Sequence, residues 1–128
     1  MSGQLEDLVV SGKELDRKSL AGTLAPYVKL DKDICNIRPL GGWDELKAYL
    51  KILTYLLARK AMMALDFDIE EEGATTSEVA RDTGLKEGTV RPALRNLLSG
   101  RLVAQSKNRR YFVPNHAIEK IKTILSEE

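Results

Sequence analysis

The stretch SEVARDTGLKEGTVRPALRNLLSGRLV, residues 77–103, has the pattern of two short helices joined by a tight turn. At its start, Thr75 and Glu78 form a capping-box pattern, in which a hydroxyl accepts a bond from a helix amide and a glutamate three residues later bonds back. This pattern predicts a first helix from about Ser77 to Thr83. Gly84 follows it and suits the left-handed backbone that ends many helices.

The second helix is predicted over residues 88–99, where apolar side chains recur at helical spacing before Gly100: Val90, Leu94, Leu97 and Leu98. Pro92 stands inside this pattern without the amide hydrogen that a helix interior uses. That defect costs about 3 kcal/mol in the interior and little in the first turn. We therefore expect the helix to begin near Gly88 or Thr89, with Thr89 as its N-cap and Pro92 in the first turn.

The residues that follow predict a two-stranded hairpin and a last helix. Apolar pairs and triplets at residues 102–103 and 111–113 flank a polar turn at residues 106–108, which predicts a hairpin with a basic tip. After Pro114, a helix is expected over residues 115–125, with its first residue as the cap.

The order of these segments resembles the winged helix-turn-helix family over about residues 54–116. The resemblance rests on a small residue in the first short helix, Gly84 in the turn, Thr89-Val90 early in the second helix, and the run of residues 100–103 entering the hairpin. The pattern is most similar to that of small archaeal and bacterial transcription regulators. It implies a mainly α fold of the α+β class with a small β-wing. Winged helices bind DNA, and some serve as protein–protein modules.

Residues 1–42 lie outside this resemblance and are expected to form an N-terminal extension. Helical segments are predicted over residues 4–10 and 13–25, the second of which ends before a proline. A small hairpin is predicted over residues 27–38, with its turn at residues 31–33.

The remaining residues, 43–128, are expected to form the winged-helix domain, whose first helix is predicted over residues 43–67. From Trp43 to Ala64, apolar residues recur at alternating three- and four-residue steps, and a second apolar stripe runs beside them. A helix that is apolar on two faces is covered from two sides. The second cover is either the extension or another copy of the chain, so we predict a homodimer through this helix, with a core helix inside a monomer as the alternative.

Basic residues gather in one part of a nearly neutral chain. The chain carries 20 Lys or Arg and 19 Asp or Glu, whereas residues 86–110 contain seven basic residues and one acid, Glu87. Such a stripe indicates a face that binds a polyanion. With the resemblance, it predicts double-stranded DNA as the partner, read in the major groove by helix 88–99 and held at the backbone by the wing, residues 104–111. The candidate contact residues are Lys86, Thr89, Arg91, Arg95, Asn96, Lys107, Arg109 and Arg110.

The alternative function is that of an adaptor whose winged helix binds another protein in a larger complex. A DNA reader requires basic residues on the helix and on the wing together, as this sequence has. An adaptor would more often present apolar residues on that face.

The sequence gives little support to an enzyme or a metal site. It contains no nucleophile elbow, phosphate loop or metal-ligand spacing, so we expect no catalytic residue, metal or cofactor. Cys35 is the single cysteine, which excludes an internal disulfide, and we expect it to be a small buried apolar residue. His116 is a poor catalytic candidate, and residues 70–72, three glutamates, are expected to form a solvated charge run. Without a signal-peptide pattern or an apolar span, we expect a cytoplasmic protein.

Overall fold

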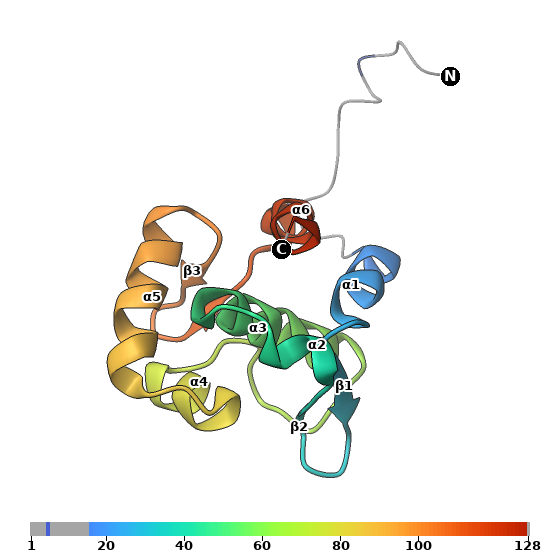
Figure 1. The fold of residues 1–128 in the computed structure, drawn as a ribbon, viewed down its shortest axis with the longest axis horizontal. Coiled ribbons are helices and arrows are strands. Elements are labelled where there is room, and N and C mark those ends of the chain that lie inside the picture. The colour runs from blue at the N-terminus through green and yellow to red at the C-terminus, as the bar shows by residue number, and fades with distance from the viewer. Residues whose placement is uncertain (1–4, 6–15, 128) are drawn as a thin grey trace.

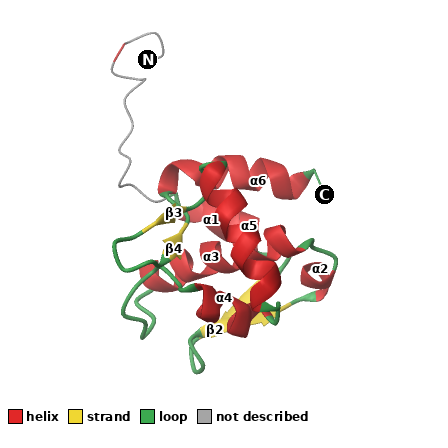
Figure 2. Ribbon diagram, turned by 90° about the vertical axis from the view of Figure 1, so that its left-hand side faces the viewer, coloured by secondary structure: helices red, strands yellow, loops and turns green. Residues whose placement is uncertain are grey.

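The chain folds into a mainly helical structure of the α+β class with two small antiparallel hairpins (Figure 1, Figure 2). The computed structural model describes residue 5 and residues 16–127. Its helices are α1 (Arg17–Leu24), α2 (Gly41–Asp44), α3 (Ala48–Ala64), α4 (Thr76–Thr83), α5 (Glu87–Ser99) and α6 (Ile118–Ser126), with a 3-10 helix, η2 (Asn115–Ala117), before α6. One hairpin pairs β1 (Val28–Asp31) with β2 (Asn36–Pro39), and the other pairs β3 (Ala104–Gln105) with β4 (Tyr111–Phe112). The predicted mainly α class with a small β part is confirmed.

Helix α3 is the centre of the core, and the other long elements pack around it (Figure 1). Every residue from 52 to 62 is buried, including two cations, Arg59 and Lys60. The covering elements are α1, α6 and the first hairpin, together with α4, α5 and β4. Both apolar faces of this helix are therefore covered within one chain, which is the monomeric arrangement weighed above. A homodimer stays a prediction, and it would have to use surface outside residues 52–62.

The long helix predicted over residues 43–67 is wrong at both ends. Trp43 lies in the separate helix α2, and the extended backbone at Lys47 (φ −66°, ψ 159°) divides the two helices. The apolar spacing could not show this break. Trp43 is buried in the separate helix α2, and the spacing would also bury it in one continuous helix. At the other end, Asp66 takes a left-handed backbone (φ 60°), and the next amide donates to the carbonyl of Met62 at 2.9 Å. This is a Schellman ending, with aspartate where glycine is commoner.

Helix α1 and the first hairpin share the core of α3. Leu20 and Leu24 of α1, Val28 of β1 and Ile37 of β2 are buried in the same apolar cluster. Arg17 at the start of α1 also donates to a carbonyl at the end of α3, at 2.7 Å. Residues 16–42 therefore pack directly on the central helix.

The first predicted helical segments are tested only in part. The helix expected over residues 13–25 is observed as α1, which begins where the carboxylate of Asp16 accepts a bond from the Ser19 amide at 2.9 Å. Residues 13–15 lie outside the described residues, and so does the helix expected over residues 4–10 apart from Leu5.

The hairpin predicted over residues 27–38 is confirmed, but its turn is displaced. Asp31 still pairs with Asn36 in the ladder, so the turn spans residues 32–35 instead of 31–33. The turn closes because Cys35 adopts a left-handed backbone (φ 49°).

The first helix of the 77–103 stretch, α4, forms with the predicted caps. The hydroxyl of Thr75 accepts from the Glu78 amide at 3.2 Å, and the Glu78 carboxylate accepts from the Thr75 amide at 2.9 Å. Gly84 ends α4 with a left-handed backbone (φ 80°). Before α4, Ala74 forms an antiparallel bridge with Tyr111, so a third chain segment joins the second hairpin.

Candidate functional site

Helix α5 presents one apolar face to the core and one polar face to solvent. Val90, Leu94 and Leu97 are buried. All of the candidate contact residues on or beside this helix are exposed: Lys86, Thr89, Arg91, Arg95 and Asn96. At 100° per residue, the middle of the exposed face also carries Gly88 and Pro92. Because neither has a long side chain, the helix backbone can approach a partner closely between the two arginines on one side and Thr89 and Asn96 on the other.

Helix α5 begins earlier than the proline argument predicts. Its N-cap is Lys86 and not Thr89, and the Val90 amide already donates to the Lys86 carbonyl at 3.0 Å. Pro92 is thus the sixth residue of α5 and lies in its second turn, where it leaves the Gly88 carbonyl without a helical donor. Gly88 is exposed, so water can satisfy that carbonyl. The late-start expectation is therefore wrong, and the exposed position explains how the proline is tolerated.

Replacing Pro92 with alanine should raise the free energy of unfolding by about 1–2 kcal/mol. The new amide can donate to the Gly88 carbonyl, a gain that is partly offset because proline also restricts the unfolded chain. Chemical denaturation of the two proteins measures the difference. Ser99→Ala, on the same exposed face, is the control and should change stability by less than about 0.5 kcal/mol. A loss of stability in Pro92→Ala would contradict the account.

The second hairpin carries the other candidate contact residues. Its loop turns at Arg109, whose backbone is left-handed (φ 62°), and both Lys107 and Arg109 are exposed. The hairpin follows α5 closely, because the Leu102 amide donates to the Leu97 carbonyl at 3.0 Å. Both views place β3 beside α5, with α5 at the front of Figure 2. The predicted hairpin with a basic tip is therefore confirmed as a structural feature.

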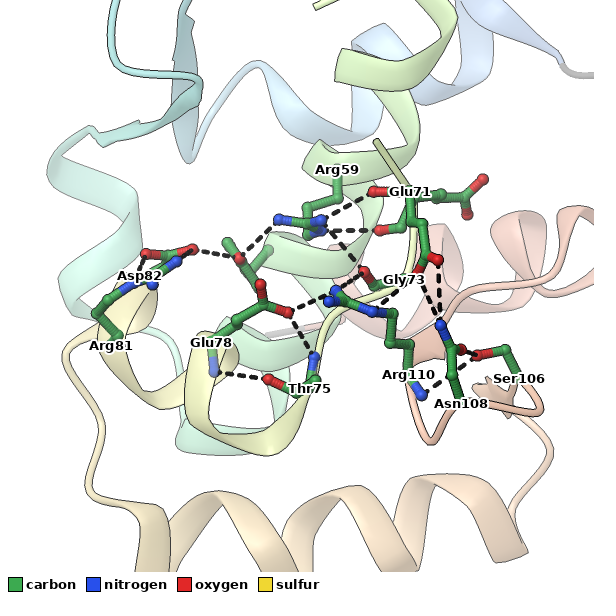
Figure 3. A network of polar contacts seen from close by, with 12 residues as sticks. Arg59, Glu71, Gly73, Thr75, Glu78, Arg81, Asp82, Ser106, Asn108 and Arg110 are labelled. Atoms are coloured by element: carbon green, nitrogen blue, oxygen red, sulfur yellow. Dashed lines mark hydrogen bonds and ion pairs between the residues drawn. The ribbon is translucent and has the colours of Figure 1, made fainter. Parts of the chain in front are cut away.

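Arg110 differs from its neighbours because its side chain points back into the protein (Figure 3). Its guanidinium forms ion pairs with Glu78 at 2.7 Å and with Glu71 at 2.8 Å, and it donates to the Gly73 carbonyl at 3.2 Å. The side chain is only 27% exposed. Arg110 is therefore not a candidate contact residue. Its role is structural, because it joins the second hairpin to α4 and to the loop before α4.

A buried arginine lies beneath this network and was not anticipated from the sequence. Arg59 of α3 is 8% exposed. Its guanidinium donates to the carbonyls of Glu71 and Glu72 at 2.8 Å, to that of Gly73 at 3.1 Å, and to the Tyr55 hydroxyl at 3.3 Å (Figure 3). One side chain thus holds three successive carbonyls of the loop that leads into α4. The available signal was a cation within the apolar pattern of the long helix.

The three glutamates at residues 70–72 are a solvated charge run only in part, because Glu70 and Glu71 are exposed but Glu71 and Glu72 form ion pairs. Glu71 pairs with Arg110, and Glu72 pairs with the buried Lys60 at 2.8 Å. Lys60 also donates to the side-chain oxygen of Asn115 at 2.7 Å. Within the described residues, no group of three or more His, Cys, Asp or Glu is placed to hold a metal ion. Glu71 and Glu72 therefore connect this loop to the hairpin and to α3.

The polar network around Arg59 continues across α3 and α4 through Tyr55, Asp82 and Arg81. The Tyr55 hydroxyl donates to the Asp82 carboxylate at 2.5 Å, and Arg81 pairs with the same carboxylate at 2.9 Å. Burial raises the pKa of Tyr55 above its ordinary value of 10, and the bond to Asp82 raises it further, so the tyrosine is neutral. Burial raises the pKa of Asp82, but the bonds from Arg81 and Tyr55 lower it more, so the carboxylate is charged.

The stability of the fold should fall at acidic pH through Glu78. Burial raises the pKa of this carboxyl, but the Thr75 amide and the Arg110 guanidinium lower it more, so its folded pKa is below the ordinary 4.5. Because the folded pKa is lowered, the Glu78 carboxylate contributes to the free energy of unfolding above pH 4.5. This contribution is lost as the pH falls through the folded pKa. Denaturation at several pH values should show a smaller loss below pH 4.5 in Glu78→Gln than in the wild type. Glu127→Gln, on an exposed residue, should keep the wild-type loss, and equal losses in all three proteins would rule out this role for Glu78.

Two other sequence expectations are corrected. Cys35 is partly exposed in the hairpin turn, with its thiol 3.5 Å from the Lys32 carbonyl, and is not a small buried apolar residue. The last helix begins at Ile118 after the 3-10 helix, so Asn115 does not cap α6. His116 lies exposed in that 3-10 helix.

Comparison of the chain with protein-family models, with curated proteins and with solved structures finds no significant match. Within the part of the chain that the structure describes, no helix is both long enough and apolar enough to cross a membrane.

Proposed function

We propose that the protein binds double-stranded DNA through the exposed face of α5 and the tip of the β3–β4 hairpin, as a winged helix-turn-helix protein of the transcription-regulator type. The observation that carries the proposal is the charge of this face. Six basic residues between 86 and 109 are all exposed, against one acid, Glu87, and they are Lys86, Arg91, Arg95, Arg101, Lys107 and Arg109. We call these six residues the basic face.

The element order supports the winged-helix part of the proposal. Helix α3 is followed by the Ala74 bridge segment, then α4, a tight turn, α5 and the two paired strands. This arrangement exposes one side of the second short helix and places a hairpin next to it, as a recognition helix with a neighbouring wing would require.

The chemistry of α5 suits base edges in the major groove. Arg91 and Arg95 are one turn apart, and arginine reads guanine with two hydrogen bonds, while Asn96 can read adenine in the same way. Arg91 lies 3.9 Å from Glu87, but this pair is exposed at both ends and contributes little, so a base can replace the glutamate. Thr89 and Lys86 lie nearer the start of the helix, where phosphate binding is favoured.

The wing tip should bind phosphates and give a strong salt dependence. Each neutralised phosphate releases counterions, so the logarithm of affinity falls linearly with the logarithm of salt concentration. Lys107→Ala or Arg109→Ala should weaken binding to every duplex and reduce that slope by about one each. Fluorescence anisotropy with a labelled random duplex, at 50–200 mM salt, measures both quantities.

The matched control for this experiment is Arg17→Ala, which removes the same charge from α1. It should leave affinity and slope nearly unchanged. Equal effects of Arg17 and Arg109 would mean that only net charge matters and that the basic face is not the site. If the protein binds no duplex at low salt while a protein partner occupies this face, the adaptor function replaces the proposal.

A further inference from the structure

An apolar groove of about 390 Å³ lies where α1, β1 and the end of α3 meet (Figure 1). Residues of the buried core line it, because Leu20, Leu24 and Val28 belong to its walls and each is no more than 5% exposed. Its volume falls in the range of about 300–1,000 Å³ that is usual for sites of small ligands. No lining residue belongs to the basic face, so the groove is a separate feature.

Alanine residues leave this groove open. Ala21 and Ala25 lie four residues apart on α1 and so share one face, and Ala61 and Ala64 lie three apart on α3. The two helices therefore present only methyl groups at these positions, and larger side chains would fill the space between them. Leu65 lines the same groove and is 52% exposed, so a ligand there would remove a large apolar side chain from water.

The charge that lines the groove is positive. Among the residues that the structure describes, the charged residues of its walls are Arg17 and Lys29, and none is an aspartate or a glutamate. The Arg17 guanidinium donates to the carbonyl of Ala64, another lining residue, at 2.7 Å, which fixes this cation at the α3 end of the groove. Lys29 is exposed and belongs to β1. An apolar ligand that carries a negative charge therefore complements the groove.

A small carboxylic acid fits this site better than a protein does. A stable protein interface uses about 20–30 residues on each side, many more than line this groove. The N–H groups of a guanidinium form a fork that matches the two oxygens of a carboxylate. A guanidinium has five N–H donors, so the bond from Arg17 to Ala64 uses only part of its capacity.

We propose that this groove binds a free medium-chain carboxylic acid in its ionised form. The alkyl chain lies between α1 and α3, against Leu24 and Ala61. The carboxylate accepts bonds from Arg17, and Lys29 adds a second positive charge at the β1 wall. The basic face takes no part, so this inference does not depend on DNA binding.

Isothermal titration calorimetry of the full-length protein with sodium hexanoate, octanoate and decanoate tests the proposal. Each acid should bind with one-to-one stoichiometry, and affinity should rise about fourfold for each added methylene, since each buries further apolar surface. The cation octyltrimethylammonium should bind weaker than octanoate by about tenfold or more, because its charge has the sign of the two wall cations. Equal affinities for octanoate and this cation, or no saturable binding of any of the three acids, would overturn the proposal.

A charge-removal variant identifies the groove as the site. Arg17→Gln with Lys29→Gln should weaken octanoate binding by about tenfold or more. The matched control is Lys120→Gln with Lys122→Gln, which removes two exposed charges from α6 and should leave affinity within about threefold of the wild type. Equal effects of the two double variants would contradict the assignment.

A second variant changes the groove wall without touching either cation. Ala21 is exposed, so Ala21→Glu keeps the fold and places a negative charge beside the bound carboxylate. Octanoate affinity should fall by about tenfold or more, whereas Ser99→Glu, at an exposed position on α5, should leave it unchanged. Unchanged affinity in Ala21→Glu would overturn the proposal. A wild-type dimer in light scattering that Ala21→Glu dissociates would also overturn it, because a second copy would then be the occupant.

Discussion

Replacing Arg59 with methionine should lower the free energy of unfolding by about 3–5 kcal/mol, because the buried guanidinium supplies hydrogen bonds to three backbone carbonyls and one hydroxyl. Methionine keeps much of the side-chain volume and removes every donor. The carbonyls of residues 71–73 would then lose their bonds from the guanidinium inside the protein. A buried acceptor without a partner costs about 1–3 kcal/mol. Urea denaturation measured by circular dichroism gives the difference.

Arg91→Met is the matched control for that experiment. Arg91 also lies near a carboxylate, that of Glu87 at 3.9 Å, but both side chains are exposed (60% and 48%), so the change should cost no more than about 1 kcal/mol. If Arg59→Met is as mild as Arg91→Met, the loop before α4 does not depend on Arg59. The central place of this residue in the fold would then be wrong.

The double change Arg91→Ala with Arg95→Ala should reduce affinity for duplex DNA by about 100-fold or more. Each arginine that reads a base edge contributes about 1–3 kcal/mol, and 1.4 kcal/mol is a factor of ten. Each single change should also relax the preference at one base position, which a competition experiment with single-base variants of the best site measures. Both side chains are exposed and opposite the buried face of α5, so stability should change little.

The control for the arginine pair is Lys120→Ala with Lys122→Ala, which removes two exposed charges from α6. This protein should bind DNA within about threefold of the wild type at 150 mM salt, since exposed charges farther away than a Debye length of about 8 Å are screened. Equal losses in the two double variants would show that α5 is not the reading element.

The parts of the fold that the sequence predicts are those fixed by local interactions. The capping box joins Thr75 and Glu78, which are only three residues apart, and Gly84 marks a left-handed backbone that glycine adopts most readily. The apolar side of α5 follows from its spacing alone. These local features also determine which residues of α5 face solvent, so the exposure of Arg91 and Arg95 could be predicted.

The parts that could not be predicted depend on partners far along the chain. Arg110 has the same sequence context as Arg109, and only the folded position of Glu71 and Glu78 separates a structural arginine from an exposed one. Arg59 likewise meets its carbonyls only once the loop has returned to α3. Charge counts along a sequence include such residues and therefore overstate a binding face.

The start of α5 was mispredicted for a different reason. The cost of a proline inside a helix depends on whether the carbonyl four residues earlier can reach water, and here Gly88 is exposed. The sequence shows that Pro92 lacks an amide donor. It does not show whether the Gly88 carbonyl, which that donor would bond, is exposed to water.

Nuclear magnetic resonance titration of the ¹⁵N-labelled protein with duplex DNA at low salt tests the central claim most directly, because it locates the bound surface by residue. We expect amide shifts concentrated in residues 86–96 and 106–109, decreasing as salt is added. We expect the amides of α1 and the first hairpin to stay unchanged. An absence of shifts at low salt, or shifts centred on α1 and β1 instead of α5, would contradict the assignment of DNA binding to the basic face.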